Sequence, residues 1–216
     1  MNKEHFKLFG VNGLYQGQSA IIGGASSFID TVDLTLLDTL ENIVIIGVNW
    51  FFKKAKAEWA VFLDSTHHSI HDNVDYIADN TFLATRYYKD IPEKLAQKAT
   101  LLFKDGDSRV FPKLYRGELV SGATSAISAL HLAAFFGCSE VLLLGIDFTA
   151  GYTHNYFTTR KKVWRNSEVR LFNRQLESIV TTYNMPVYQA NEKAKTTVPT
   201  KKFEDFCHGI DRSPKN

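Results

Sequence analysis

The sequence has little cysteine, little proline and no excess of charge of either sign. Two cysteines, Cys138 and Cys207, occur in 216 residues, which is too few for a disulfide framework and favours a reducing compartment. Five prolines and 13 glycines argue against long disordered segments. The 25 basic and 23 acidic residues leave a net charge of +2, so the chain lacks the strong basic excess of a protein that binds a nucleic-acid polymer.

Long apolar runs are also absent. A membrane span needs ~20 consecutive apolar residues, and the run at 141–146 is far shorter. The first seven residues are mostly polar and no uninterrupted apolar region follows them, so we expect no signal peptide. The sequence therefore predicts a soluble, cytoplasmic protein whose residues 1–216 form one domain.

Apolar, β-branched segments alternate with segments of helical periodicity along the chain. We expect strands at 18–22, 42–48, 58–63, 81–84, 99–103, 140–144 and 186–188, helices at 33–40, 70–78, 123–136 and 167–183, and one further helical turn at 203–207. This alternation predicts a single α/β, Rossmann-like domain with a mostly parallel sheet and helices on both faces. The expected core spans residues 18–190, and a polar tail follows at 193–216.

Small and polar residues follow the first two strands, at the edge where such sheets bind ligands. Gly23, Gly24 and Ser26 form either a backbone cradle for a phosphate or an ordinary tight turn. Asn49 follows the second strand, where it either binds a ligand or caps the next helix. Both sets of residues are therefore candidates for binding a nucleotide.

Two further candidates flank a later helix. Ser121 and Gly122 open this helix, whose free N–H groups suit an anion, although Ser121 can equally be its N-cap. His131, inside the helix, is expected to be a packed histidine. Gly145 and Asp147 directly follow the next, fully apolar strand. An aspartate at that position either caps the following loop or binds ribose hydroxyls, an acceptor hydroxyl or a metal.

Histidines gather after the third strand. Asp64 ends that strand, and His67, His68 and His71 follow it closely. One of these imidazoles can act as a general base because it titrates near neutral pH. His67 and His71, spaced i and i+4, can also share a metal ion if they lie on one helical turn. A solvated loop capped by Asp64 is the structural alternative.

A polar, aromatic and basic loop follows Asp147. It contains Tyr152, His154 and Tyr156, and a basic stretch at 160–165. Long loops at the ligand edge of a sheet often form lids or acceptor sites. The basic stretch can neutralise a diphosphate or an acidic substrate, or it is an ordinary solvated charge run.

Four of these segments occur in a familiar order and spacing: residues 20–27, residues 47–51, the Ser121-Gly122 helix start and residues 144–148. Together they resemble the superfamily of the bacterial lipooligosaccharide sialyltransferases (glycosyltransferase family 42) and the motility-associated-factor glycosyltransferases. Archaeal hydroxymethylpterin diphosphokinase-like proteins share the domain of the latter. The resemblance spans roughly residues 18–190.

The resemblance implies a site for a cytidine-monophosphate sugar that works without a metal. The implied nucleotide-binding residues are Gly23, Gly24, Ser26, Asn49, Ser121, Gly122, Gly145 and Asp147, and we add Asp64 at the end of the third strand. Paired tyrosines assist the departing phosphate in the sialyltransferases, and Tyr152 and Tyr156 lie in a comparable loop. The sialyltransferases carry a catalytic histidine just ahead of the late helix, where this chain has Ser167. His154, in a Gly-x-Thr-His pattern like that of the motility-associated family, is the replacement candidate, with His67 and His68 as rivals.

The leading hypothesis is an enzyme, a glycosyltransferase that uses a nucleotide-activated sugar, such as a CMP-nonulosonic acid, by direct displacement. Its partners would be that donor and a glycan or small-molecule acceptor, and it would need no cofactor. The first alternative is a Mg²⁺-dependent pyrophosphokinase that acts on a pterin-like acceptor, with Asp64 and Asp147 as metal ligands. The second is a degenerate nucleotide-binding module without catalysis.

Overall fold

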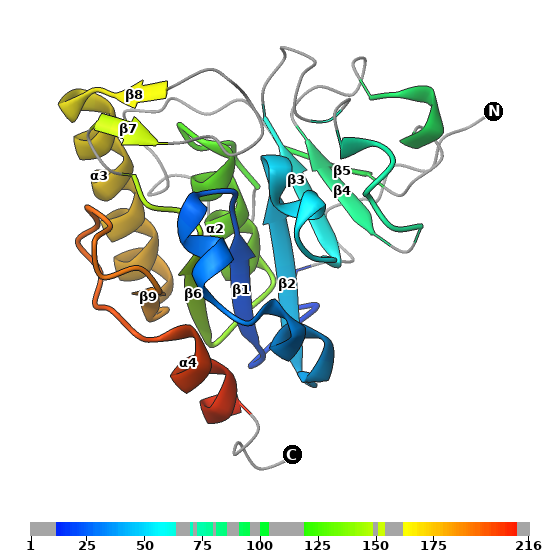
Figure 1. The fold of residues 1–216 in the computed structure, drawn as a ribbon, viewed down its shortest axis with the longest axis horizontal. Helices are drawn as coiled ribbons and strands as arrows, with labels where there is room; N and C mark the ends of the chain where they lie inside the picture. The colour runs from blue at the N-terminus through cyan, green and yellow to red at the C-terminus, as the bar shows by residue number, and fades with distance from the viewer. Residues whose placement is uncertain are drawn as a thin grey trace.

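A parallel sheet of seven strands organises the chain. The computed structural model describes residues 12–63, 70, 73–79, 81–85, 91–95, 100–103, 119–148, 151–153 and 162–210. The strands are β1 (Ser19–Gly23), β2 (Ile43–Val48), β3 (Trp59–Phe62), β4 (Phe82–Thr85), β5 (Thr100–Leu102), β6 (Glu140–Leu144) and β9 (Val187–Gln189). They lie in the order β5-β4-β3-β2-β1-β6-β9 (Figure 1). All six pairings are parallel, which confirms the expected Rossmann-like α/β fold.

The strand order reverses beside β1. From β1 the chain adds β2 to β5 on one side, and it then returns to add β6 and β9 on the other. Gly23, the last residue of β1, is in register with Gly47 of β2 and with Leu144 of β6. The carboxyl ends of β1, β2 and β6 therefore meet at the switch point of the sheet, where open α/β sheets bind ligands.

Both faces of the sheet are covered. Side chains alternate along each strand, so Ile22 and Val44 lie in one apolar cluster with helices α2 (Ser125–Phe135) and α3 (Asn166–Tyr183). Ile21 and Ile43 lie in the other cluster, which is covered by helix α4 and by short 3₁₀ helices. The helices of this second face are η2 (Ser27–Thr31), η3 (Leu34–Thr39), η4 (Asn49–Lys53) and α4 (Phe203–Ile210).

Some elements differ from the sequence-based expectation. The helix expected at 33–40 is the 3₁₀ helix η3. Thr39 donates its hydroxyl to the carbonyl of Leu36, three residues back, at 2.7 Å, and this contact suits the i to i+3 spacing of a 3₁₀ turn. Strands β7 (Gly151–Thr153) and β8 (Lys162–Trp164) form an antiparallel pair that the sequence did not predict. The helix expected at 70–78 lies partly outside the described residues, and η6 (Glu93–Leu95) is a further short turn.

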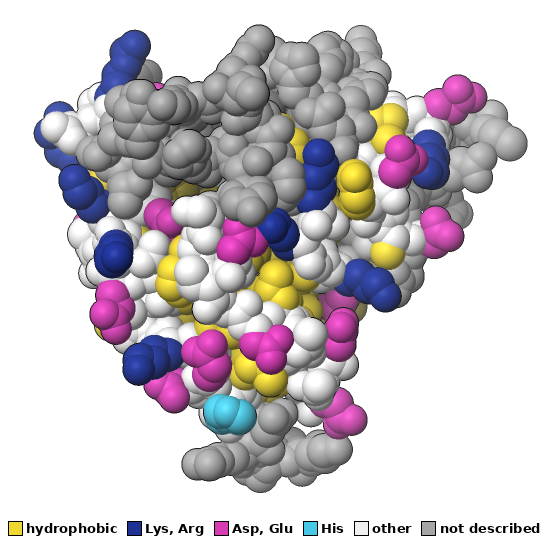
Figure 2. Space-filling model, viewed as in Figure 1, with side chains coloured by type: hydrophobic (Ala, Val, Ile, Leu, Met, Phe, Trp, Pro, Cys, Tyr) yellow, Lys and Arg dark blue, Asp and Glu magenta, His cyan; other side chains and the backbone are white. Residues whose placement is uncertain are grey.

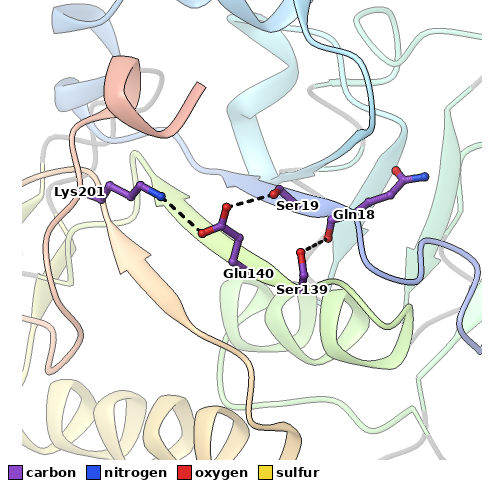
Figure 3. A network of polar contacts seen from close by, with 5 residues as sticks. All are labelled: Gln18, Ser19, Ser139, Glu140 and Lys201. Carbon is purple, nitrogen blue, oxygen red and sulfur yellow. Dashed lines mark hydrogen bonds and ion pairs between the residues drawn. The ribbon is translucent and has the colours of Figure 1, made fainter. Parts of the chain in front are cut away.

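The segment after β9 packs back onto the sheet. Thr200 forms a parallel bridge with Gln189, and α4 then buries Phe203, Phe206, Cys207 and Ile210 against the second face. Residues 203–210 therefore form two turns of an amphipathic helix where one turn and a polar tail were expected. A network of polar contacts accompanies this docking (Figure 3). Glu140 of β6 accepts a hydrogen bond from Ser19 of β1 at 3.1 Å and forms an ion pair with Lys201 at 3.4 Å.

The described surface carries both signs of charge. Figure 2 shows basic side chains along the edge formed by α3 and acidic side chains toward the end that carries α4. Arg165, Arg170 and Arg174 are exposed on or beside α3. Among the described residues, no helix is long and apolar enough to cross a membrane.

Candidate functional site

The turns after β1 and β6 touch through their backbones. The Gly24 amide donates to the carbonyl of Leu144 at 2.8 Å, and the Ser26 amide donates to that of Gly145 at 3.0 Å. A Cβ atom on Gly24 would lie 2.4 Å from the carbonyl oxygen of Gly145, and Gly145 itself has a φ of +68°. Glycine is therefore required at both positions by close approach and backbone conformation.

Packing also accounts for the neighbouring glycines. A Cβ atom on Gly23 would lie 2.2 Å from the Phe51 ring, and one on Gly122 would lie 2.2 Å from Ile127. The Phe51 side chain is fully buried against these strand ends. Local packing thus explains why these residues are glycines.

Residues 145–147, which we call the site turn, are held by three separate segments of the chain. The carbonyl of Gly145 accepts the Ser26 amide, as described above. The carbonyl of Ile146 accepts the side-chain amide of the buried Gln189 at 2.7 Å. The carbonyl of Asp147 accepts the backbone amide of Lys195 at 3.1 Å. Because every carbonyl of the site turn is engaged with the protein, its conformation is fixed before any ligand arrives.

Asp147 presents a free carboxylate oxygen from this fixed turn. Its Oδ1 atom is buried and has no hydrogen-bond partner among the described residues, and the same holds for the hydroxyl of Ser26 across the turn contact. Phe148, the next residue, adopts a φ of +42° and stacks on Phe172 of α3. Buried polar groups are normally satisfied, and strained backbone of this kind clusters at functional sites. Asp147 is therefore a candidate on this turn for binding a partner from outside the fold.

A third buried polar atom of this kind lies at the end of β2. The indole Nε1 of Trp50 is buried and finds no hydrogen-bond partner in the part of the chain that the structure describes, although a buried tryptophan N–H usually has one. Its neighbour Asn49 has a φ of +53° and begins η4, so Asn49 does not cap an α-helix. The ends of β1, β2 and β6 thus each carry one unsatisfied buried polar atom.

Helix α2 starts at the same edge. Its N-cap is Thr124, whose hydroxyl accepts the Ile127 amide at 3.2 Å, so Ser121 is not the N-cap and the helix begins two residues later than expected. Ser125 donates its hydroxyl to the Asn49 side chain at 3.4 Å, which joins the end of β2 to the helix start. The amides of Ser125 and Ala126 belong to the first turn, which lacks intrahelical acceptors. These amides can receive an anion.

Polar side chains from the interior fix the segment that leads into α2. The Ala123 amide donates to Gln175 of α3 at 3.0 Å, and the Gly122 amide donates to Ser128 at 2.7 Å. His131 is fully buried, contacts the Val120 carbonyl at 3.1 Å and contacts the Tyr183 hydroxyl at 2.8 Å. Burial lowers the pKa of His131 to about 4, so the ring is neutral at pH 7. The expectation of a packed histidine is confirmed.

The proposed catalytic side chains are not among those brought together here. His154, His67, His68, Tyr156 and Asp64 lie outside the described residues. Tyr152 lies in β7, paired with Val163 of β8, and its side chain is not described. No group of three His, Cys, Asp or Glu side chains in the described part of the chain could hold a metal ion.

Three residues of this region were missed from the sequence. Gln175 is a buried polar residue within the apolar stripe of α3, and that interruption is a usable signal. Gln189 lies at the end of the expected core and Lys195 in the expected polar tail, and no local pattern marks either residue for its contact with the site turn. A hollow of about 280 Å³ is lined by the last turns of α3, by residues 186–188 and by residues 197–199, and none of the candidate site residues lines it.

Several solved structures of a sialyltransferase share this fold. No family profile and no curated protein matches the chain. The sialyltransferase CstII from Campylobacter jejuni, in complex with cytidine-5'-monophosphate, is 16% identical over 86% of this chain and 85% of that chain, with a TM-score of 0.53. A CST-II variant in complex with CMP is 13% identical with a TM-score of 0.57, covering 87% and 88% of the two chains. CST-II in complex with a trisaccharide acceptor and CMP is 16% identical over the same shares, with a TM-score of 0.52. At these identities the likeness establishes the fold.

Proposed function

We propose that this chain is a glycosyltransferase that binds a nucleotide-activated sugar at the carboxyl ends of β1, β2 and β6. The observation that carries the proposal is the unpartnered, buried Oδ1 atom of Asp147 on a turn whose three carbonyls are all engaged. The fold shared with CMP-binding sialyltransferases supports it. A carboxylate fixed in this way is suited to accept hydroxyl groups, which a nucleotide sugar presents on its ribose.

The remaining groups divide the ligand between them. The Ser26 hydroxyl and the Trp50 indole N–H would add hydrogen bonds that the fold leaves unmade. The first amides of α2 would receive the phosphate, since a helix start carries partial positive charge. Asn49 would contact the nucleotide beside Ser125. Cytidine monophosphate carrying a nonulosonic acid is the donor that the resemblance favours.

The transfer would proceed by direct displacement. The acceptor hydroxyl loses its proton to a base and its oxygen attacks the anomeric carbon, while the bond from that carbon to the phosphate oxygen breaks. His154 is the leading candidate for the base, with His67 and His68 as rivals, and Tyr152 or Tyr156 would protonate the departing phosphate. No cofactor takes part in this scheme.

Calorimetric titration with CMP, UMP and a CMP-sugar tests the proposal. We expect a pyrimidine nucleotide to bind at micromolar to millimolar affinity, and Asp147→Asn to weaken binding about 10- to 150-fold, because a hydrogen bond to a charged group contributes about 1.5–3 kcal/mol. Asp38→Asn is the matched control, since Asp38 is exposed on η3. Absence of nucleotide binding, or equal affinities for the two variants, would show that the proposal is wrong.

Turnover assays separate this function from its alternatives. Release of CMP from a CMP-sugar in the presence of an acceptor is expected, and His154→Ala should abolish it if His154 is the base. Consumption of ATP with magnesium and a hydroxymethylpterin would instead identify a pyrophosphokinase. Nucleotide binding with neither activity would indicate a binding module.

A further inference from the structure

The site turn carries a negative charge at the place where an anionic ligand is expected. Asp147 contributes a carboxylate, and the donor of the proposed function contributes at least one phosphate. Of the described residues that bind the site turn or the start of α2, only Lys195 is charged. The others are neutral: Ser26, Gln189, Asn49, Gln175 and Thr124. Attraction to a cation would offset the repulsion between carboxylate and phosphate.

Lys195 is fixed at this place through its backbone on both sides. Its amide donates to the carbonyl of Asp147 at 3.1 Å, and its carbonyl accepts the side-chain amide of Asn173 of α3 at 3.1 Å. The turn before it is closed by Asn191, which accepts the Lys193 amide through its side chain and the Ala194 amide through its carbonyl. The root of the Lys195 side chain is therefore held beside the site turn.

The ammonium group of Lys195 is available for a ligand. The residue is exposed, and its side chain forms none of the ion pairs found within the described part of the chain. By contrast, Lys201, a few residues further on, is engaged with Glu140 and lies over the Tyr188 and Phe206 rings. Lys195 thus combines a backbone that is bound twice with a charge that no described residue pairs.

We propose that Lys195 is a binding residue of this site and that its ammonium group pairs with the phosphate of the bound nucleotide. This inference rests on the proposed function, because it assumes that a nucleotide occupies the site. Asp147 would then bind the sugar hydroxyls while Lys195 binds the phosphate. The segment after β9 thereby becomes part of the ligand site.

The test compares CMP with cytidine, which lacks the phosphate, by calorimetry on the full chain. Lys195→Gln should weaken CMP binding about 10-fold and leave cytidine binding unchanged. The loss should be largest at low salt, because an exposed cation is screened by ions. Lys193→Gln is the matched control, since Lys193 is exposed two residues away and its amide bonds within its own turn. Thermal melts of both variants should superimpose on that of the parent chain.

Each outcome decides one question. If the parent chain binds CMP and Lys195→Gln binds it equally well, the inference is overturned while the proposed function stands. If Lys195→Gln loses affinity for CMP and cytidine equally, Lys195 has a structural role. If Lys195→Gln and Lys193→Gln lose CMP affinity equally, the effect comes from overall charge. Either result overturns the inference. If the parent chain binds neither compound, the proposed function fails and the inference fails with it.

Discussion

Gly24 offers the sharpest test of the contact between the β1 and β6 turns. Replacing it with alanine would place a Cβ atom 2.4 Å from the Gly145 carbonyl oxygen and 2.8 Å from Cγ1 of Ile146. The first of these atoms is backbone in a turn held by three hydrogen bonds, so it cannot move aside alone. Overpacking of this kind costs about 1–3 kcal/mol, and weakening the Gly24 to Leu144 hydrogen bond adds about 1 kcal/mol.

We therefore expect Gly24→Ala to lower the free energy of unfolding by about 2–4 kcal/mol. For a chain of this size that corresponds to a fall in Tm of about 5–15 °C. Urea denaturation followed by circular dichroism measures the loss, and Gly209→Ala is the matched control. A Cβ atom on Gly209 would meet nothing within 4 Å, so this change in α4 should be neutral or stabilising by about 0.5 kcal/mol. A Gly24→Ala variant as stable as Gly209→Ala would refute the close contact of the two turns.

Two titratable groups, the buried His131 and the partly desolvated Glu58 on the surface, should make stability depend on pH in opposite directions. His131 has a pKa of about 4 in the fold, below its ordinary value, so the free energy of unfolding should fall by about 3 kcal/mol as pH falls from about 6.5 to 4. Urea melts should show a weaker dependence of stability on pH for His131→Gln and an unchanged dependence for His208→Gln. If the stability of the parent chain does not change over this pH range, the assignment is wrong. Burial raises the pKa of Glu58, while a hydrogen bond from Tyr15 partly opposes the rise. Its contribution should therefore be present below the ordinary glutamate pKa and lost as pH rises through the raised value, so Glu58→Gln should be more stable than the parent at pH 7 and Glu177→Gln, on the exposed side of α3, should not.

The core of the fold was predictable because strands and helices of a parallel α/β domain carry strong local signals. The β-branched run of β2 and the apolar run of β6 are buried on both faces, as parallel strands require. The limits of α3 were nearly right because its apolar stripe ends at Asn184, which adopts a left-handed conformation. The sequence predicts a helix at η3 without distinguishing a 3₁₀ helix from an α-helix, because three-residue and four-residue periodicities cannot be told apart over six residues.

The site was predictable in position and only partly in composition. The rule that ligands bind beyond the carboxyl ends of parallel strands located the turns after β1, β2 and β6. The sequence could not reveal that Gly24 and Gly145 meet, because that contact depends on the register of β1 and β6 across more than 100 intervening residues. It also could not place Gln189 and Lys195 on the site turn. Their roles arise from a segment that leaves the sheet and returns to it.

That returning segment couples the site to the stability of the fold. One end of it fixes the carbonyl of Asp147 through Lys195, and the other end anchors α4 through Lys201 and Glu140 at the start of β6 (Figure 3). Both contacts depend on the chain continuing along β9 through Gln189, whose own backbone accepts the Lys201 amide at 3.1 Å. Loosening α4 would expose apolar surface and break the Lys201 contact, whereas Asn173 of α3 also holds Lys195. If loosening α4 frees residues 195–201 as well, a ligand that binds only the ordered site turn would by linkage stabilise the docking of α4, even though α4 lies on the second face of the sheet.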